Sequence, residues 1–172
     1  MPDHDDPSSD VRPASVAELL GAWRAAERRW ERRAPEDEVR RSALEVVRAW
    51  AAYQNAALPS EGSEFLLVAD GEGVYVDATK GVSRVLGYRP SELVGLRIHD
   101  IAAPELRAGT TLEWERFLAD GRQDGQYRLV AKDGRLVALR YQARAHHPVP
   151  GFHVSRLWPV GVVPDHQGSA GT

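Results

Sequence analysis

The sequence predicts an α+β domain that follows a pair of N-terminal helices. Apolar residues recur with helical spacing up to about residue 58. After a break at Pro59 to Gly62 they form short runs typical of strands, and turn signals such as Asp133-Gly134 separate these runs. At 172 residues, 42% apolar and 27% charged, the chain is long enough for one well-cored domain and an appendage.

The first predicted helix begins at Ser15. Glu18 follows three residues later, which is the capping-box pattern in which each side chain satisfies a free backbone donor of the other residue. Apolar residues then recur at intervals of three and four, and place one stripe along a helix. The stripe consists of Val16, Leu19, Trp23, Ala26 and Trp30.

A second, longer helix is predicted from Pro35 to Leu58. Proline suits the first turn of a helix, and the acidic residues after it favour the positive end of the helix dipole. Its apolar stripe is Val39, Ala43, Val46, Trp50, Tyr53 and Ala57. A helix of about 34 Å exceeds what a small domain needs for internal packing.

We therefore expect residues 15–58 to form a dimerisation segment, since large aromatic side chains are costly to expose. In the alternative arrangement, the two helices fold back on the outer face of the sheet and bury the same stripe within one chain. The expected dimer contacts are Val16, Leu19, Trp23, Trp30, Val46, Trp50 and Tyr53.

The rest of the chain predicts the order β-β-α-α-α-α-β-β-β. Strands are expected at 65–68 and 74–76, helical pieces at 80–86, 90–94, around 99–100 and at 108–119, and strands at 126–131, 135–145 and 152–160. In the fourth strand the alternation favours Val137, Leu139, Tyr141 and Ala143 as the buried face. Residues 1–14 and 161–172 are predicted to be disordered tails, and residues 59–64 a linker.

Three stretches at the turns resemble the PAS family of sensory and signalling domains: Val68 to Ala78, Val85 to Gly95, and Tyr127 to Arg135. They occur in the order and spacing of that family. The resemblance implies a five-stranded antiparallel sheet with short helices on one face, spanning residues 65–160.

The resemblance also implies a small-molecule pocket between the sheet and the long helix. A filled core that holds no ligand is the alternative, because all the candidate residues are ordinary core types. The expected lining is Leu67, Val76, Val85, Leu86, Leu112, Trp114, Phe117, Tyr127, Leu129, Leu139, Tyr141 and Val154.

The composition restricts the cofactors. Without cysteine the chain cannot form a flavin adduct, a cysteinyl chromophore or a disulfide. Haem-binding relatives use a histidine as axial ligand, and His99 is the candidate if haem is present, although the segment resembles a polar turn. His146, His147 and His153 have no carboxylate nearby in sequence, so we expect solvated loop histidines and no metal site. No bound cofactor is the favoured prediction.

No sequence motif of a hydrolase, nucleotide-binding site or metalloprotease is present, and we expect no catalysis. The predicted function is a sensory module that responds to a small ligand or partner and signals through a homodimer to a separately encoded protein. The alternative is a ligand-free interaction module that docks a kinase or transcription regulator.

The location is expected to be cytoplasmic and the source bacterial. The N-terminus lacks the order of a secretory signal, and no apolar run is long enough to span a membrane. Only Lys80 and Lys132 among the 22 basic residues are lysine, which is typical of a GC-rich genome. Arginines on the N-terminal helices alternate with acidic residues, and the net charge is −3, so no nucleic-acid binding is expected.

Overall fold

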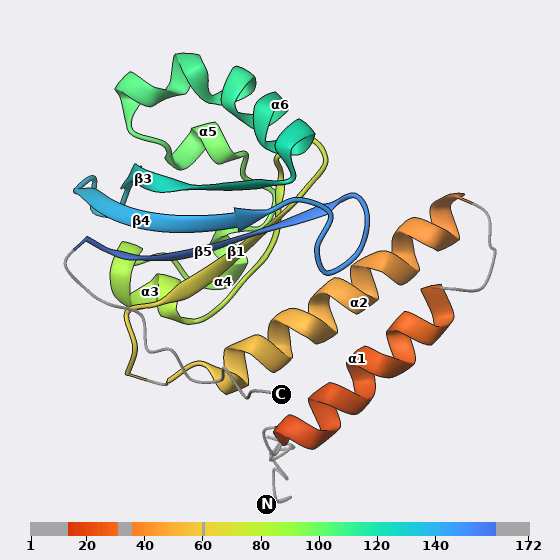
Figure 1. Ribbon diagram of the computed structural model, residues 1–172. Coiled ribbons are helices and arrows are strands. Elements are labelled where there is room, and N and C mark those ends of the chain that lie inside the picture. Colours follow the sequence, from red (N-terminus) through yellow and green to blue (C-terminus); the bar gives the residue numbers. More distant parts are fainter. Residues whose placement is uncertain (1–13, 31–35, 60, 161–172) are drawn as a thin grey trace, which may run out of the picture.

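The structure is a computed structural model that describes residues 14–30, 36–59 and 61–160 (Figure 1). The helices are α1 (Val16–Trp30), α2 (Glu36–Ala57), α3 (Gly81–Leu86), α4 (Pro90–Leu93), α5 (Ile98–Ile101), the 3-10 helix η1 (Pro104–Gly109) and α6 (Thr110–Asp120). The strands are β1 (Phe65–Asp70), β2 (Tyr75–Ala78), β3 (Arg122–Val130), β4 (Leu136–Arg144) and β5 (Phe152–Pro159). This order confirms the predicted one. Within the described ranges, no helix combines the length and apolarity needed to cross a membrane.

The start of α1 confirms the predicted capping box. The backbone N–H of Ser15 donates to Glu18 Oε2 over 2.6 Å, and the N–H of Glu18 donates to Ser15 Oγ over 3.3 Å. These bonds satisfy two of the donors that a helix start leaves unpaired. The start of the N-terminal helical hairpin, the name used here for α1 and α2 together, is therefore encoded by residues within one helical turn.

The five strands form one antiparallel sheet in the order β2-β1-β5-β4-β3. Residues of α3, α4 and α5 pack with one face of the sheet, called here the inner face, and α6 lies over the same face. Helix α2 packs against the other, outer face (Figure 1). The strand count, the antiparallel pairing and the N-terminal position of the long helices agree with the predicted fold class.

The inner face carries the main core. Along β4, Leu139 and Ala143 are buried, Val137 and Tyr141 are half-buried, and the intervening residues are exposed. This confirms the predicted alternation, because successive side chains of a strand point to opposite faces. The largest fully buried side chains of this cluster are Phe65, Leu86, Leu93, Ile101 and Leu139.

The outer face carries a second core, formed by α1, α2 and the sheet. Val46 is fully buried and Trp50 is 5% exposed, and both pack with Leu66 and Val154 of the sheet. This is the arrangement in which the helices fold back on their own sheet. Burial of Val46 and Trp50 therefore needs no second chain.

The other expected dimer residues whose side chains are described are less deeply buried. Trp23 and Tyr53 are half-buried, with ring centroids 6.0 Å apart, and Leu19 is half-buried. Val16 is 46% exposed. The side chain of Trp30 lies outside the described residues. Of this set, Val16 and Leu19 at the start of α1 are the aliphatic side chains still open to a partner.

Candidate functional site

A cavity of about 90 Å³ lies between α6 and the inner face of the sheet. Helix α6 presents Thr110, Glu113, Trp114 and Phe117 to it, at the spacing of one helical face. Most of the lining is apolar or aromatic. The remaining lining residues are Leu67, Ala69, Tyr75, Ile98, Gln123, Tyr127, Leu129, Tyr141, Ala143, His153, Ser155 and Leu157.

Strand β5 supplies both faces of the sheet with buried side chains. His153, Ser155 and Leu157 point to the cavity, whereas Phe152 and Val154 pack in the outer cluster with α2. This division follows from the two-residue period of a strand. Strand β5 therefore separates the cavity from the N-terminal helices and contacts both.

Six of the predicted lining residues do line the cavity: Leu67, Trp114, Phe117, Tyr127, Leu129 and Tyr141. Leu139, Val85 and Leu86 lie in the same inner core but do not line the cavity. Whether the cavity holds a ligand stays a prediction.

The placement predicted for Leu112, Val76 and Val154 is wrong. Leu112 is 55% exposed, because it lies on the side of α6 away from the residues at 110, 113, 114 and 117. Val76 and Val154 pack in the outer cluster, because each lies out of phase with the cavity-facing positions of its strand.

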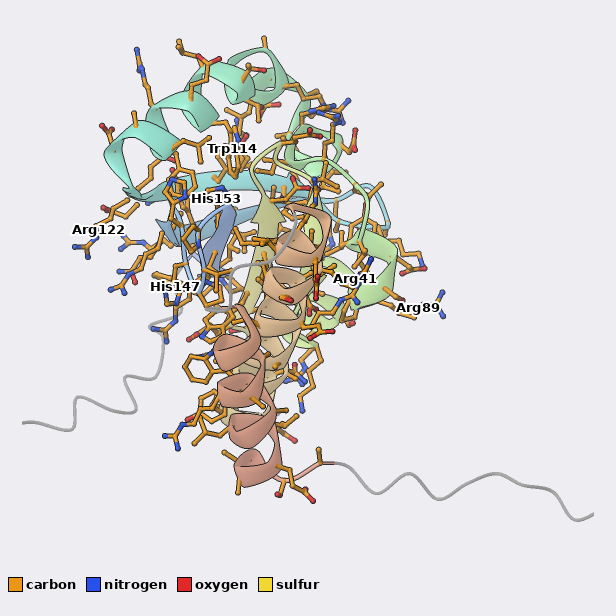
Figure 2. All side chains as sticks on the ribbon, turned by 90° about the vertical axis from the view of Figure 1, so that its right-hand side faces the viewer. Arg41, Arg89, Trp114, Arg122, His147 and His153 are labelled. Carbon is orange, nitrogen blue, oxygen red and sulfur yellow. The ribbon has the colours of Figure 1, made fainter. Side chains whose placement is uncertain are left out.

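His153 is a buried residue of β5, and the expectation of a solvated loop histidine is wrong. Its side chain is only 3% exposed, and its ring lies at near right angles to that of Trp114, with centroids 5.2 Å apart (Figure 2). Nδ1 accepts a hydrogen bond of 3.1 Å from the backbone N–H of His146. The two-residue period of a strand places His153 on the same face as Leu157 of the inner core, but the residues of β5 did not indicate which face that is.

Two polar atoms of the cavity lining are buried without a hydrogen-bond partner: His153 Nε2 and the Tyr127 hydroxyl. Thr110 lies close enough to Tyr127 for its side chain to act to lower the pKa of that hydroxyl, and the Thr110 hydroxyl itself donates to the Leu106 carbonyl over 3.1 Å. Most buried polar groups in folded proteins are paired. Two such groups in one largely apolar cavity are polar positions that a ligand could pair.

Burial controls the charge of these groups. It lowers the pKa of His153 to about 4, with a smaller contribution from His146, while Asp70 acts in the opposite direction. Burial also raises the pKa of Tyr127 and of Tyr141. Near neutral pH all three side chains are uncharged, so the cavity offers neutral hydrogen-bonding groups.

The depressed pKa of His153 makes stability fall in mild acid. In the unfolded chain the histidine has its ordinary pKa near 6.5, so on acidification the unfolded chain binds a proton before the folded chain does. The free energy of unfolding is therefore unaffected by the titration of His153 above about pH 6.5 and falls as the pH is lowered from there to about pH 4. We expect the loss to be about 2 to 3 kcal/mol. Urea unfolding at pH 7 and pH 4 measures it: the drop should be smaller in His153→Phe than in the wild type. Equal drops in wild type and His153→Phe would contradict the assignment.

His99 lies in α5 with a half-exposed side chain, and its Nε2 is 3.3 Å from Asp100 Oδ1. Asp100 caps the helix by accepting the Arg97 N–H over 2.6 Å, which confirms the predicted polar turn. His99 does not line the cavity, and about 90 Å³ is well below the roughly 300 Å³ or more of common cofactor pockets. The residues present do not fit a haem with His99 as its axial ligand. Among the described residues, no group of three side chains is arranged to hold a metal ion.

Comparison with known proteins places residues 75–151 in the family described as the PAS fold. A crystal structure of the PAS domain of a protein from Colwellia psychrerythraea superimposes with a TM-score of 0.54 at 18% identity, covering 62% of this chain and 94% of that one. Wild-type Drosophila melanogaster Cycle PAS-B with bound ethylene glycol gives a TM-score of 0.49 at 19% identity, covering 55% and 98%. No curated protein matches the chain.

Proposed function

The chain belongs to the PAS domain family, and from this we propose that it is a non-catalytic sensor whose cavity under α6 binds a small molecule. PAS domains are generally sensory or signalling modules. The observation that carries the proposal is the pair of unpartnered polar groups, on His153 and Tyr127, that line one largely apolar cavity.

A change in the cavity would reach α2 through β5 and the loop that precedes this strand. This loop, residues 145–151, donates the His146 N–H to His153 on the cavity side. Its next residue, His147, packs edge-on against Trp50 of α2, with ring centroids 5.3 Å apart. Val149 of the same loop is buried in the outer cluster. A ligand that moves His153 would therefore change the contacts between this loop and α2.

The N-terminal helices are the proposed output. A homodimer would form through the exposed start of α1, where Val16 and Leu19 remain open, and a separately encoded signalling protein would read the change. Sensing requires two packing states that a ligand biases differently. The support for α2 as the responding element is its direct contact with the loop at residues 145–151.

A screen of small uncharged molecules by two-dimensional NMR tests the proposal. We expect some of them to shift the indole N–H of Trp114, which donates to the Gly71 carbonyl over 3.2 Å at the cavity, and then that of Trp50. Ser155→Leu should abolish these shifts because it fills the cavity. Leu112→Ala, on the exposed side of α6, should leave them unchanged.

A different observation favours the interaction-module alternative. Arg122, Arg140 and Arg144 lie on the outer face of β3 and β4, and Arg122 is the direct register partner of Arg144. Like charges directly opposite each other destabilise a sheet, and among the described residues none of the three has an ion-pair partner. Such a face suits a partner with an acidic surface. If no molecule in the screen shifts Trp114, the sensor proposal is refuted and this alternative is preferred.

A further inference from the structure

We infer that His153 determines the ligand class: its Nε2–H selects an uncharged molecule that presents a hydrogen-bond acceptor. The inference rests on the proposed function, because it assigns a role at the same cavity. It depends on four properties of the site: which ring nitrogen of His153 carries the proton, what surrounds that nitrogen, the charges that line the cavity, and its size.

The hydrogen-bond network fixes the proton on Nε2. A backbone N–H can only donate, so the 3.1 Å bond from His146 requires Nδ1 of His153 to be the acceptor. A neutral imidazole then has its single N–H at Nε2. His146 is itself fixed, because its Nδ1 accepts the Gly151 N–H over 3.3 Å. The donor of His153 is therefore set by the loop and not by the ligand.

The Nε2–H has no oxygen or nitrogen acceptor within the described residues. The rings nearest to His153 on α6 are those of Trp114, with an interplanar angle of 85°, and Phe117, at 73° and a centroid distance of 5.9 Å. Aromatic rings are weak acceptors compared with oxygen. A ligand oxygen at this position gains a bond that the protein alone leaves unmade, whereas a hydrocarbon leaves the donor buried and unpaired.

The charges around the cavity disfavour an anion. Glu113 is the charged side chain among the lining residues, and it lies at the exposed mouth on α6. No lysine or arginine lines the cavity to pair with a carboxylate or phosphate. A cation would lie against the N–H donor of His153, which cannot attract a positive charge. An uncharged ligand with an acceptor fits both constraints.

The volume of the cavity limits the part of the ligand that lies beneath α6. A dry cavity of roughly 150 Å³ is known to accept benzene, so about 90 Å³ suits a compact group of a few non-hydrogen atoms. The Tyr127 hydroxyl, also unpartnered, provides a second polar contact in the lining. A small ketone, amide or alcohol, alone or as one end of a longer molecule, has the required chemistry.

Cyclopentanone and methylenecyclopentane test the inference, because they share shape and size and differ in the acceptor. Titration of the full chain, followed at the Trp114 indole N–H, should show the ketone binding about tenfold or more tightly than the hydrocarbon. In His153→Phe the preference should fall to about twofold or less, with hydrocarbon binding retained. Leu112→Ala, on the exposed side of α6 away from the cavity, should keep the preference.

A second measurement keeps the test decisive if His153→Phe does not fold. The ¹⁵N shift of His153 Nε2 in the wild-type chain should move with the ketone and not with the hydrocarbon. Equal affinities for the ketone and the hydrocarbon, or a ¹⁵N shift of Nε2 that does not change when the ketone is added, would overturn the selective role of His153. The cavity would then be an apolar binding site. Binding of neither molecule would overturn the proposed function as well.

Discussion

Replacement of Trp50 by alanine is expected to lower the free energy of unfolding by about 3 to 5 kcal/mol. The side chain is 5% exposed and packs in the outer cluster between α2 and the sheet, where it also contacts the ring of His147. Removing it leaves a cavity that the surrounding strands cannot fill without moving. Urea unfolding followed by circular dichroism measures the change.

The matched control for this substitution is Val16→Ala. Val16 is also in the N-terminal helical hairpin but is 46% exposed, so we expect a change within about 0.5 kcal/mol. The loss in Trp50→Ala should be independent of protein concentration, because its contacts lie within one chain. Val16→Ala is compared at a concentration at which the chain is monomeric, because Val16 belongs to the proposed dimer contact. A loss in Trp50→Ala that shrinks as concentration rises, together with dimers in sedimentation, would show that a second chain holds the helices.

Gly81→Ala is expected to destabilise the domain by about 3 kcal/mol or more. A Cβ atom at Gly81 would lie 2.2 Å from the carbonyl oxygen of Glu64 and 3.2 Å from the Cβ of Phe65. The first contact is with backbone, which cannot rotate away. The start of α3 would have to move off β1, and with it the fully buried side chains of Val82 and Leu86.

Gly109→Ala is the control for the effect of adding a methyl group. At Gly109, φ is −91° and no atom lies within 4 Å of the added Cβ, so we expect little change in the free energy of unfolding. Thermal unfolding of both variants provides the comparison. Similar melting temperatures for the two would show that α3 is not held as closely against β1 as the structure indicates.

Local patterns were sufficient to predict the elements and their order. Ser15 and Glu18 identified the start of α1 because the capping box acts within one turn, and the structure contains both hydrogen bonds. The alternation through Leu139 and Ala143 identified the inner face of β4, because a half-exposed strand keeps its polar residues on the other side. In both cases the information lies within a few neighbouring residues.

The candidate site was predicted less completely, because lining a cavity depends on tertiary packing. Strand β5 is buried on both faces and shows no polar alternation, so its apolar residues did not reveal which of them face α6. Val154 was therefore placed on the wrong face, and His153 was missed. The stripe containing Val46 and Trp50 showed that α2 needs a partner, but apolar periodicity cannot distinguish the chain's own sheet from a second copy.

The burial of β1 and β5 on both faces of the sheet has a consequence for how this protein can diversify. Neither strand has a solvent-exposed residue, whereas every second residue of β4 is open. Substitutions at 153, 155 and 157 of β5 alter the cavity, those at Phe152 and Val154 alter the packing of α2, and a one-residue insertion would exchange the two sets. Evolutionary drift should therefore concentrate on β3, β4 and the outer side of α6. A mutant library that aims to change ligand preference without uncoupling the helices should vary β5 only at 153, 155 and 157.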